Sequence, residues 1–84
     1  MALIIVASFS VSFRVIGDNV TTILDLDVSQ PPYNIPGTIK RVPDLIVEGI
    51  PGLTVGKTFT NSVVTLTFSA PFVGVAAVRM VVLT

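Results

Sequence analysis

Residues 7–16 read A-S-F-S-V-S-F-R-V-I, and this stretch decides the fold class. Its odd-numbered positions are apolar, and its even-numbered positions from Ser8 to Arg14 are polar. Alternation with a period of two indicates a strand that buries one face and exposes the other. We therefore expect a long strand here, packed on a core through its apolar face.

The rest of the chain repeats the pattern in shorter segments between turn residues. Further strands are expected at 20–29, 38–42, 44–48, 63–69 and 72–84, with shorter extended pieces at 53–55 and 58–60. Gly17, Asp18 and Asn19 predict a tight hairpin, because glycine and asparagine tolerate positive φ. Pro43 lacks a backbone donor, so its segment should be an edge or carry a bulge. Gly56 and Lys57 suggest another turn.

No segment of useful length has helical periodicity, and no linker or internal repeat divides the chain. Short strands at regular turn spacing are typical of small antiparallel sheets. The sequence therefore predicts an all-β fold, a small antiparallel β-sandwich or barrel of six to seven short strands. It predicts a single β domain over residues 1–84.

The composition is unusually apolar for so small a chain. Hydrophobic residues make up 51% of the 84 residues and charged residues 12%, against about 25% charged in typical domains. Mean hydropathy is +0.90. A small domain has too much surface to hide all these side chains, and large exposed apolar patches mark interaction sites. We expect a partner to cover part of the surface.

Candidate contacts lie in three segments. The N-terminal run is apolar on both faces, the 30–37 loop carries the only tyrosine, and the final strand is apolar on both faces apart from Arg79. The interface candidates are Leu3, Ile5, Tyr33, Ile35, Arg79, Val81 and Leu83. Tyr33 suits a contact loop and equally suits packing back on its own domain. Arg79 is interpreted as an intersubunit ion pair, with snorkelling to the surface as the alternative.

The residues that usually carry chemistry are missing. The chain has no histidine and no cysteine, and neither a P-loop nor a dinucleotide-binding glycine motif occurs. Asp25 and Asp27 share one strand face and suit half of a calcium site or a glycosidase pair, but a solvated strand face explains them better. Asp18 with Asn19 is interpreted as a turn. We expect no enzyme activity, no catalytic residue, no cofactor and no metal.

Nucleic acid and membranes are not expected partners. Net charge is zero, and among the five basic residues only Lys40 and Arg41 are adjacent, too few for phosphate neutralisation. An ordinary solvated edge explains that pair better than an acidic partner surface does. The longest apolar run, 72–83, contains Arg79 and falls short of the about 20 residues that span a bilayer. No basic region precedes the N-terminal run, so a signal peptide is not expected.

These observations favour a non-enzymatic structural assembly protein. We expect a virion component, such as a capsid decoration or cement protein that bridges neighbouring subunits and is located in the virion. Its partners would be other copies of itself, with a trimer favoured, and a larger assembly such as a capsid. The alternative is a small carbohydrate- or receptor-binding β-sandwich module, for which Tyr33 is the best stacking residue.

Overall fold

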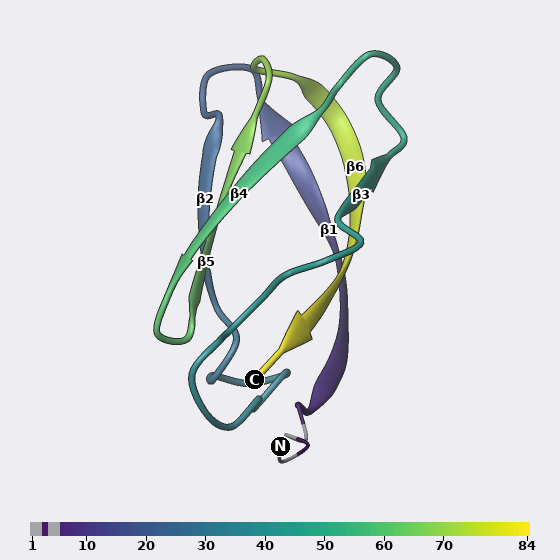
Figure 1. Ribbon diagram of the computed structural model, residues 1–84. Coiled ribbons are helices and arrows are strands. Elements are labelled where there is room, and N and C mark those ends of the chain that lie inside the picture. Colours follow the sequence, from purple (N-terminus) through teal and green to yellow (C-terminus); the bar gives the residue numbers. More distant parts are fainter. Residues whose placement is uncertain (1–2, 4–5) are drawn as a thin grey trace.

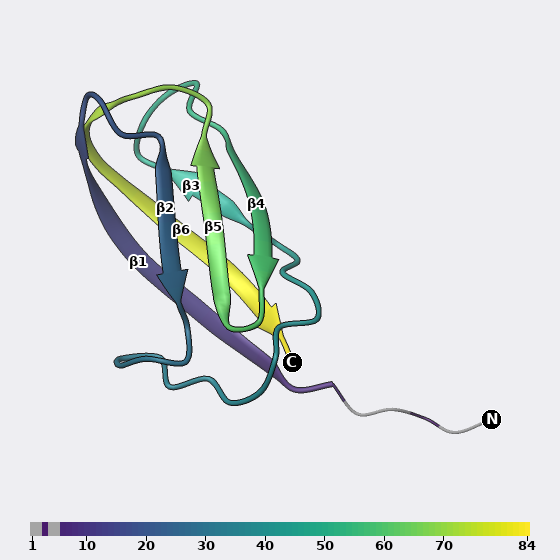
Figure 2. The same ribbon diagram turned by 90° about the vertical axis from the view of Figure 1, so that its left-hand side faces the viewer.

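The computed structural model describes residue 3 and residues 6–84. Within these residues the chain is all-β, with six strands in two antiparallel sheets that pack together (Figure 1). The strands are β1 (Ser8–Asp18), β2 (Ile23–Asp27), β3 (Ile46–Glu48), β4 (Val55–Thr60), β5 (Val63–Phe68) and β6 (Val73–Leu83). One sheet has the order β1-β6-β3 and the other β2-β5-β4. The predicted all-β fold is confirmed, and the layers are those of a small β-sandwich (Figure 2).

The core lies between the inner faces of the two sheets and centres on the middle strands β5 and β6. Val64 and Leu66 from β5 meet Val78 and Val82 from β6, and all four are fully buried. Each fully buried side chain of this size contributes about 1.5–3 kcal/mol through removal from water. No buried polar or charged side chain occurs in the described part of the chain, so apolar packing supplies most of the cohesion.

The strand predicted from residues 7–16 is present as β1. It pairs antiparallel with β6 along its whole length, from Ser8 opposite Leu83 to Asp18 opposite Val73. Its inward positions pack on the core, and its serines and Arg14 are exposed. The alternation in the sequence therefore identified both the strand and the face that it buries.

The predicted hairpin at Gly17, Asp18 and Asn19 is wrong. β1 and β2 belong to different sheets, so the chain arches from one layer to the other. Two contacts direct it: the N–H of Asn19 donates to the carbonyl of Phe72 at 2.9 Å, and the Asp18 carboxylate accepts from the N–H groups of Val20 and Thr21. Only β4 and β5 are consecutive strands of one sheet, and they join at Asn61, which has a φ of 55°.

Pro43 lies on an edge beside a bulge, in agreement with its prediction. Arg41 pairs with Leu83 and Ile46 with Arg79, so the edge segment holds one more residue than the stretch of β6 that it accompanies. The extra residue lies between Arg41 and Ile46, and Asp44 within this stretch has a φ of 56°. A bulge of this kind shifts the side-chain alternation by one position, and both Val42 and Leu45 consequently pack on the core.

The segment 38–42 and the predicted turn at Gly56 and Lys57 differ in kind from their predicted structure. Residues 38–42 form no strand, because their donors are divided between the sheets: the N–H of Ile39 donates to Asn61 and that of Lys40 to Leu83. Gly56 and Lys57 are not a turn but lie inside β4, opposite Thr67 and Leu66 of β5. Lys57 therefore occupies an inward position on an edge strand, which discourages the addition of a foreign strand there.

Candidate interaction surface

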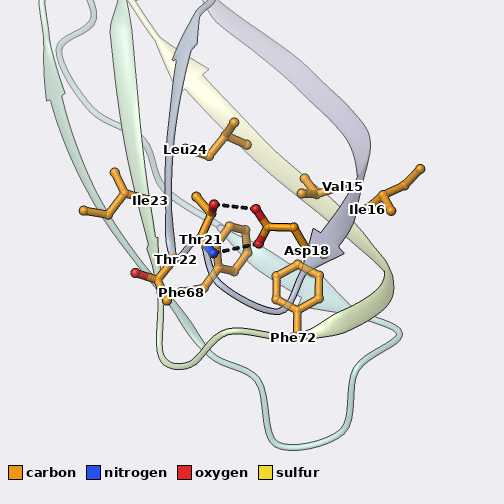
Figure 3. Close-up of a pocket in the computed structure, with 10 residues that line it drawn as sticks. Val15, Ile16, Asp18, Thr21, Thr22, Ile23, Leu24, Phe68 and Phe72 are labelled. Atoms are coloured by element: carbon orange, nitrogen blue, oxygen red, sulfur yellow. Dashed lines mark hydrogen bonds between the residues drawn. The ribbon is translucent and has the colours of Figure 1, made fainter.

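An apolar groove opens between the edges of the two sheets, beside the arch from β1 to β2. Its volume is about 190 Å³, and both strands contribute to its walls (Figure 3). Leu24 from β2 and Val15 from β1 line it together with two aromatic rings, Phe68 and Phe72. The only charged side chain in the lining is Asp18. The groove therefore favours apolar contacts over recognition of a charged ligand.

The two aromatic rings stiffen the base of this groove. Phe68 ends β5 and Phe72 precedes β6, and their ring centroids lie 5.3 Å apart at an interplanar angle of 61°. This edge-to-face geometry is one of the preferred arrangements of aromatic pairs. Phe72 also lies directly against Gly17, where a Cβ atom would come within 2.5 Å of its ring. Both rings are nearly fully buried, so they support the surface from beneath.

Exposed apolar side chains lie at the same end of the domain as the groove, and we call them the apolar rim: Ile16, Val20, Ile23, Val73 and Val75. Ile16 is 80% exposed and lies directly opposite Val75 in the β1–β6 pairing. Val73 is 69% exposed and lies opposite Asp18. Neighbours in a sheet that share a face lie about 5 Å apart. These three side chains therefore form a continuous patch on the outer face of the sheet.

Asp18 fixes the arch that carries Val20. Its carboxylate accepts a hydrogen bond from the Thr21 hydroxyl at 2.6 Å and from the N–H groups of Thr21 at 2.7 Å and Val20 at 2.9 Å. The Thr21 hydroxyl, followed by these N–H groups, lowers the pKa of Asp18 to about 2. The charged form is favoured because every one of these partners donates to it.

Acid should therefore weaken the fold. The pKa of Asp18 is about 2 in the folded protein against an ordinary value of 3.8, so the ionised carboxylate stabilises the fold above pH 3.8 and ceases to do so as pH falls toward 2. We expect the urea midpoint to decrease through this interval. Asp18→Asn should lower the midpoint at neutral pH and reduce the decrease in acid, and an unchanged acid response would contradict the assignment.

The candidates of the N-terminal run and the 30–37 loop lie in different environments. Leu3 is 98% exposed, and Ile5 lies outside the described residues. Tyr33 is half-buried and packs on the core. Ile35 is buried, at 3% exposure, and its N–H donates to Val28 at 2.8 Å. Ile35 is therefore a core residue of the single chain and offers no contact surface, because the loop folds inward at this position.

The candidates on β6 lie on the outer face of the sheet. Val81 and Leu83 are half-buried, because the 41–43 segment runs beside them. Arg79 is exposed and donates to the carboxylate of Glu48 on β3. Its charge is matched within the chain without any contribution from a second subunit. The structure thus separates these three residues from the apolar rim, which occupies the opposite end of β6.

The carboxylates singled out in the sequence each have local partners. The Asp25 carboxylate accepts from the Thr65 hydroxyl at 2.6 Å, and that of Asp27 accepts from the hydroxyls of Ser29 and Ser62 and from the Ser29 N–H. The Ser29 hydroxyl is the main cause of the lowered pKa of Asp27. No group of three potential metal ligands occurs among the residues that the structure describes. Lys40 and Arg41 are exposed next to β6.

Sequence reasoning missed the apolar rim, although one signal for it was present. Ile16 occupies the same side of β1 as Ser12 and Arg14, so it interrupts the polar face of an otherwise regular alternation. Val20 and Ile23 were assigned to a strand that begins only at Ile23. Their position at the same end of the domain as Val73 depends on the arch between the sheets, which the local sequence pattern does not indicate.

No helix in the described residues is long and apolar enough to cross a membrane. The chain matches no protein-family model, and neither the curated proteins nor the solved structures contain a significant match to it.

Proposed function

We propose that this chain is a non-enzymatic structural protein that bridges neighbouring subunits of a larger assembly, as a capsid decoration or cement protein does in a virion. The observation that carries the proposal is the apolar rim. Its side chains are 48% to 80% exposed and lie together at one end of the domain. Isolated exposed apolar residues are ordinary, but a continuous patch such as that of Ile16, Val73 and Val75 marks a surface that a partner covers.

A single copy of the chain leaves part of its apolar residues exposed. The core takes one face of each sheet, and β6 has apolar residues on its other face as well. Val73 and Val75 are therefore left in water by a single copy. Permanent interfaces are the ones that tolerate the most apolar contact. Zero net charge also gives a free chain little electrostatic protection against association.

The alternative of a carbohydrate-binding module receives less support from the aromatic side chains. All six lie within the described residues, and only Phe59 is exposed, at 37%. Tyr33, the best stacking residue in the sequence, packs partly on the core. Sugar binding that is abolished by Tyr33→Ala on a glycan array would favour this alternative over the assembly protein.

The proposal predicts that the outer part of the apolar rim is needed for incorporation into particles. In the native host, the tagged full-length chain should sediment with large particles on a sucrose gradient. Val73→Ser combined with Val75→Ser should move it into the light fractions, because the apolar contact is lost while both positions remain solvent-facing. Ile46→Ser is the matched control. Ile46 is also exposed on this sheet, but it lies on the edge strand β3 and is not part of the apolar rim. A parent chain that remains in the light fractions would contradict the proposed function.

A further inference from the structure

The free edge of β1 is the longest unpaired strand edge in the described part of the chain. β1 pairs with β6 on one side only, over Ser8–Asp18. Ala7 and Thr84, which continue this pairing, exchange both backbone hydrogen bonds, at 3.3 and 2.9 Å. Doubly bonded pairs recur at every second residue of an antiparallel ladder. The odd-numbered residues of β1 therefore bond to β6, and the even-numbered residues direct their N–H and C=O groups toward the free edge.

This edge carries few of the devices that usually block strand addition. It contains no proline and no inward-facing charge, and its only two charged side chains, Arg14 and Asp18, have opposite signs. The edge strand β4, in contrast, carries the inward-facing Lys57. Long unpaired edges without such protection are templates for pairing with another chain.

We propose that a second copy of this chain pairs its β1 antiparallel with this edge, about a two-fold axis that passes between the two copies of Ile16. This inference rests on the proposed function and names one of the contacts within the assembly. Only the even-numbered residues have outward-directed backbone groups, so only pairings of even with even residues form hydrogen bonds across the edge.

Charge selects one register among these pairings. With Ile16 opposite Ile16 of the second copy, the two strands overlap over residues 14–18, and Arg14 of each copy lies opposite Asp18 of the other. No other symmetric register places these unlike charges opposite each other, and the register centred on Arg14 places two like charges together. Opposite charges and apolar pairs across a strand ladder are each favourable, and like charges are unfavourable. Arg14 and Asp18 are both exposed and on the outer face.

The same register extends the apolar rim across the two-fold axis. Val75 lies beside Ile16 in each copy, so the joined sheet carries an unbroken row of Val75, Ile16, Ile16 and Val75, with one ion pair on each side. The edges of β1 and β2 lie on the same side of the sandwich (Figure 2), and the grooves of the two copies therefore meet beneath the paired strands. Each dimer presents twice the apolar surface of one chain to the larger assembly. The contact is two-fold, in place of the three-fold symmetry expected from the sequence.

The mass in solution tests the pairing. Light scattering on the full chain at micromolar concentration should give twice the chain mass of 8.9 kDa. Arg14→Glu should raise the dissociation constant at least about tenfold, because both ion pairs become repulsive contacts. Asp18→Lys should do the same. An equimolar mixture of the two variants should recover the dimer, because each introduced charge then faces its opposite. Recovery of the dimer in the mixture would show that both variants are folded and that the charges act across the two-fold axis.

Cross-linking tests the register without altering these charges. The chain has no cysteine, so Ile16→Cys should form an intermolecular disulfide dimer under mild oxidation, and Ser12→Cys, on the same face, should not. A monomer, a trimer, or cross-linking at Ser12→Cys but not at Ile16→Cys would overturn the inference. A monomer that still sediments with particles would leave the proposed function standing. A dimer that never enters particles would overturn the proposed function but would still support the pairing of the two β1 strands.

Discussion

Replacing Leu66 with alanine is expected to lower the free energy of unfolding by about 2–5 kcal/mol, the range for deleting a well-packed leucine. Leu66 is fully buried at the middle of the central strand β5, with Leu24 on one side and Lys57 on the other. Its strand β5 is paired with β2 on one side and β4 on the other, so the backbone has little freedom to collapse around the cavity. The total stability of a small domain is about 5–15 kcal/mol. This one change therefore removes a large part of it.

Thr67→Ala is the matched control for this measurement. Thr67 is adjacent on the same strand but points to the exposed outer face, and surface substitutions usually change stability by less than about 0.5 kcal/mol. Urea unfolding should show a lower midpoint for Leu66→Ala with an unchanged slope. Equal midpoints for the two variants would mean that β5 does not lie in the core.

Gly17→Ala is expected to cost about 3 kcal/mol, at the upper end of the range for overpacking. A Cβ atom at this position would lie 2.1 Å from the carbonyl oxygen of Phe72 and 2.5 Å from its ring. The carbonyl is backbone and already accepts from Asn19, so it cannot move without opening the end of the β1–β6 ladder. The strain would also disturb the arch that holds Val20.

Gly56→Ala provides the comparison, because Gly56 is likewise a strand glycine. The nearest atom to its Cβ position lies 3.9 Å away, the carbonyl oxygen of Thr67. Here alanine should be neutral or stabilising by up to about 1 kcal/mol, since it restricts the unfolded chain. In thermal unfolding, Gly17→Ala should therefore lower the midpoint temperature clearly, whereas Gly56→Ala should leave it unchanged or raise it. Similar losses for both would indicate that Phe72 does not approach Gly17 as described.

The sequence was informative wherever a strand buries one face and exposes the other. β1, β5 and β6 were predicted to within a few residues because their apolar positions recur with a period of two or because they are rich in valine. Pro43 was correctly placed at an edge, because proline has no N–H to donate and is confined mainly to edge strands and bulges. In these cases the chemistry of a single residue or a short pattern determines the local structure.

The prediction failed where a distant contact decides the path of the chain. Asp18 and Asn19 are compatible with a hairpin, and only the bond from Asn19 to Phe72 directs the chain to the other sheet. The apolar rim depends on that arch, so the local sequence pattern could not indicate it. Ile35 illustrates the opposite error, because an apolar residue in a proline loop gives no local sign that it packs on the core.

The pairing of β1 with β6 joins the first strand of the fold to the last. During synthesis, residues near the amino terminus leave the ribosome seconds before those of β6, at about 5–20 residues per second. Until then β1 and β3 have no partner in their sheet, because both bond only to β6. The nascent chain therefore holds β1 and β3 without their sheet partner until β6 has been synthesised and has emerged. Non-local pairing of this kind also makes folding slow, so a stop codon before Val73 would leave β1 and β3 without their only partner in the sheet.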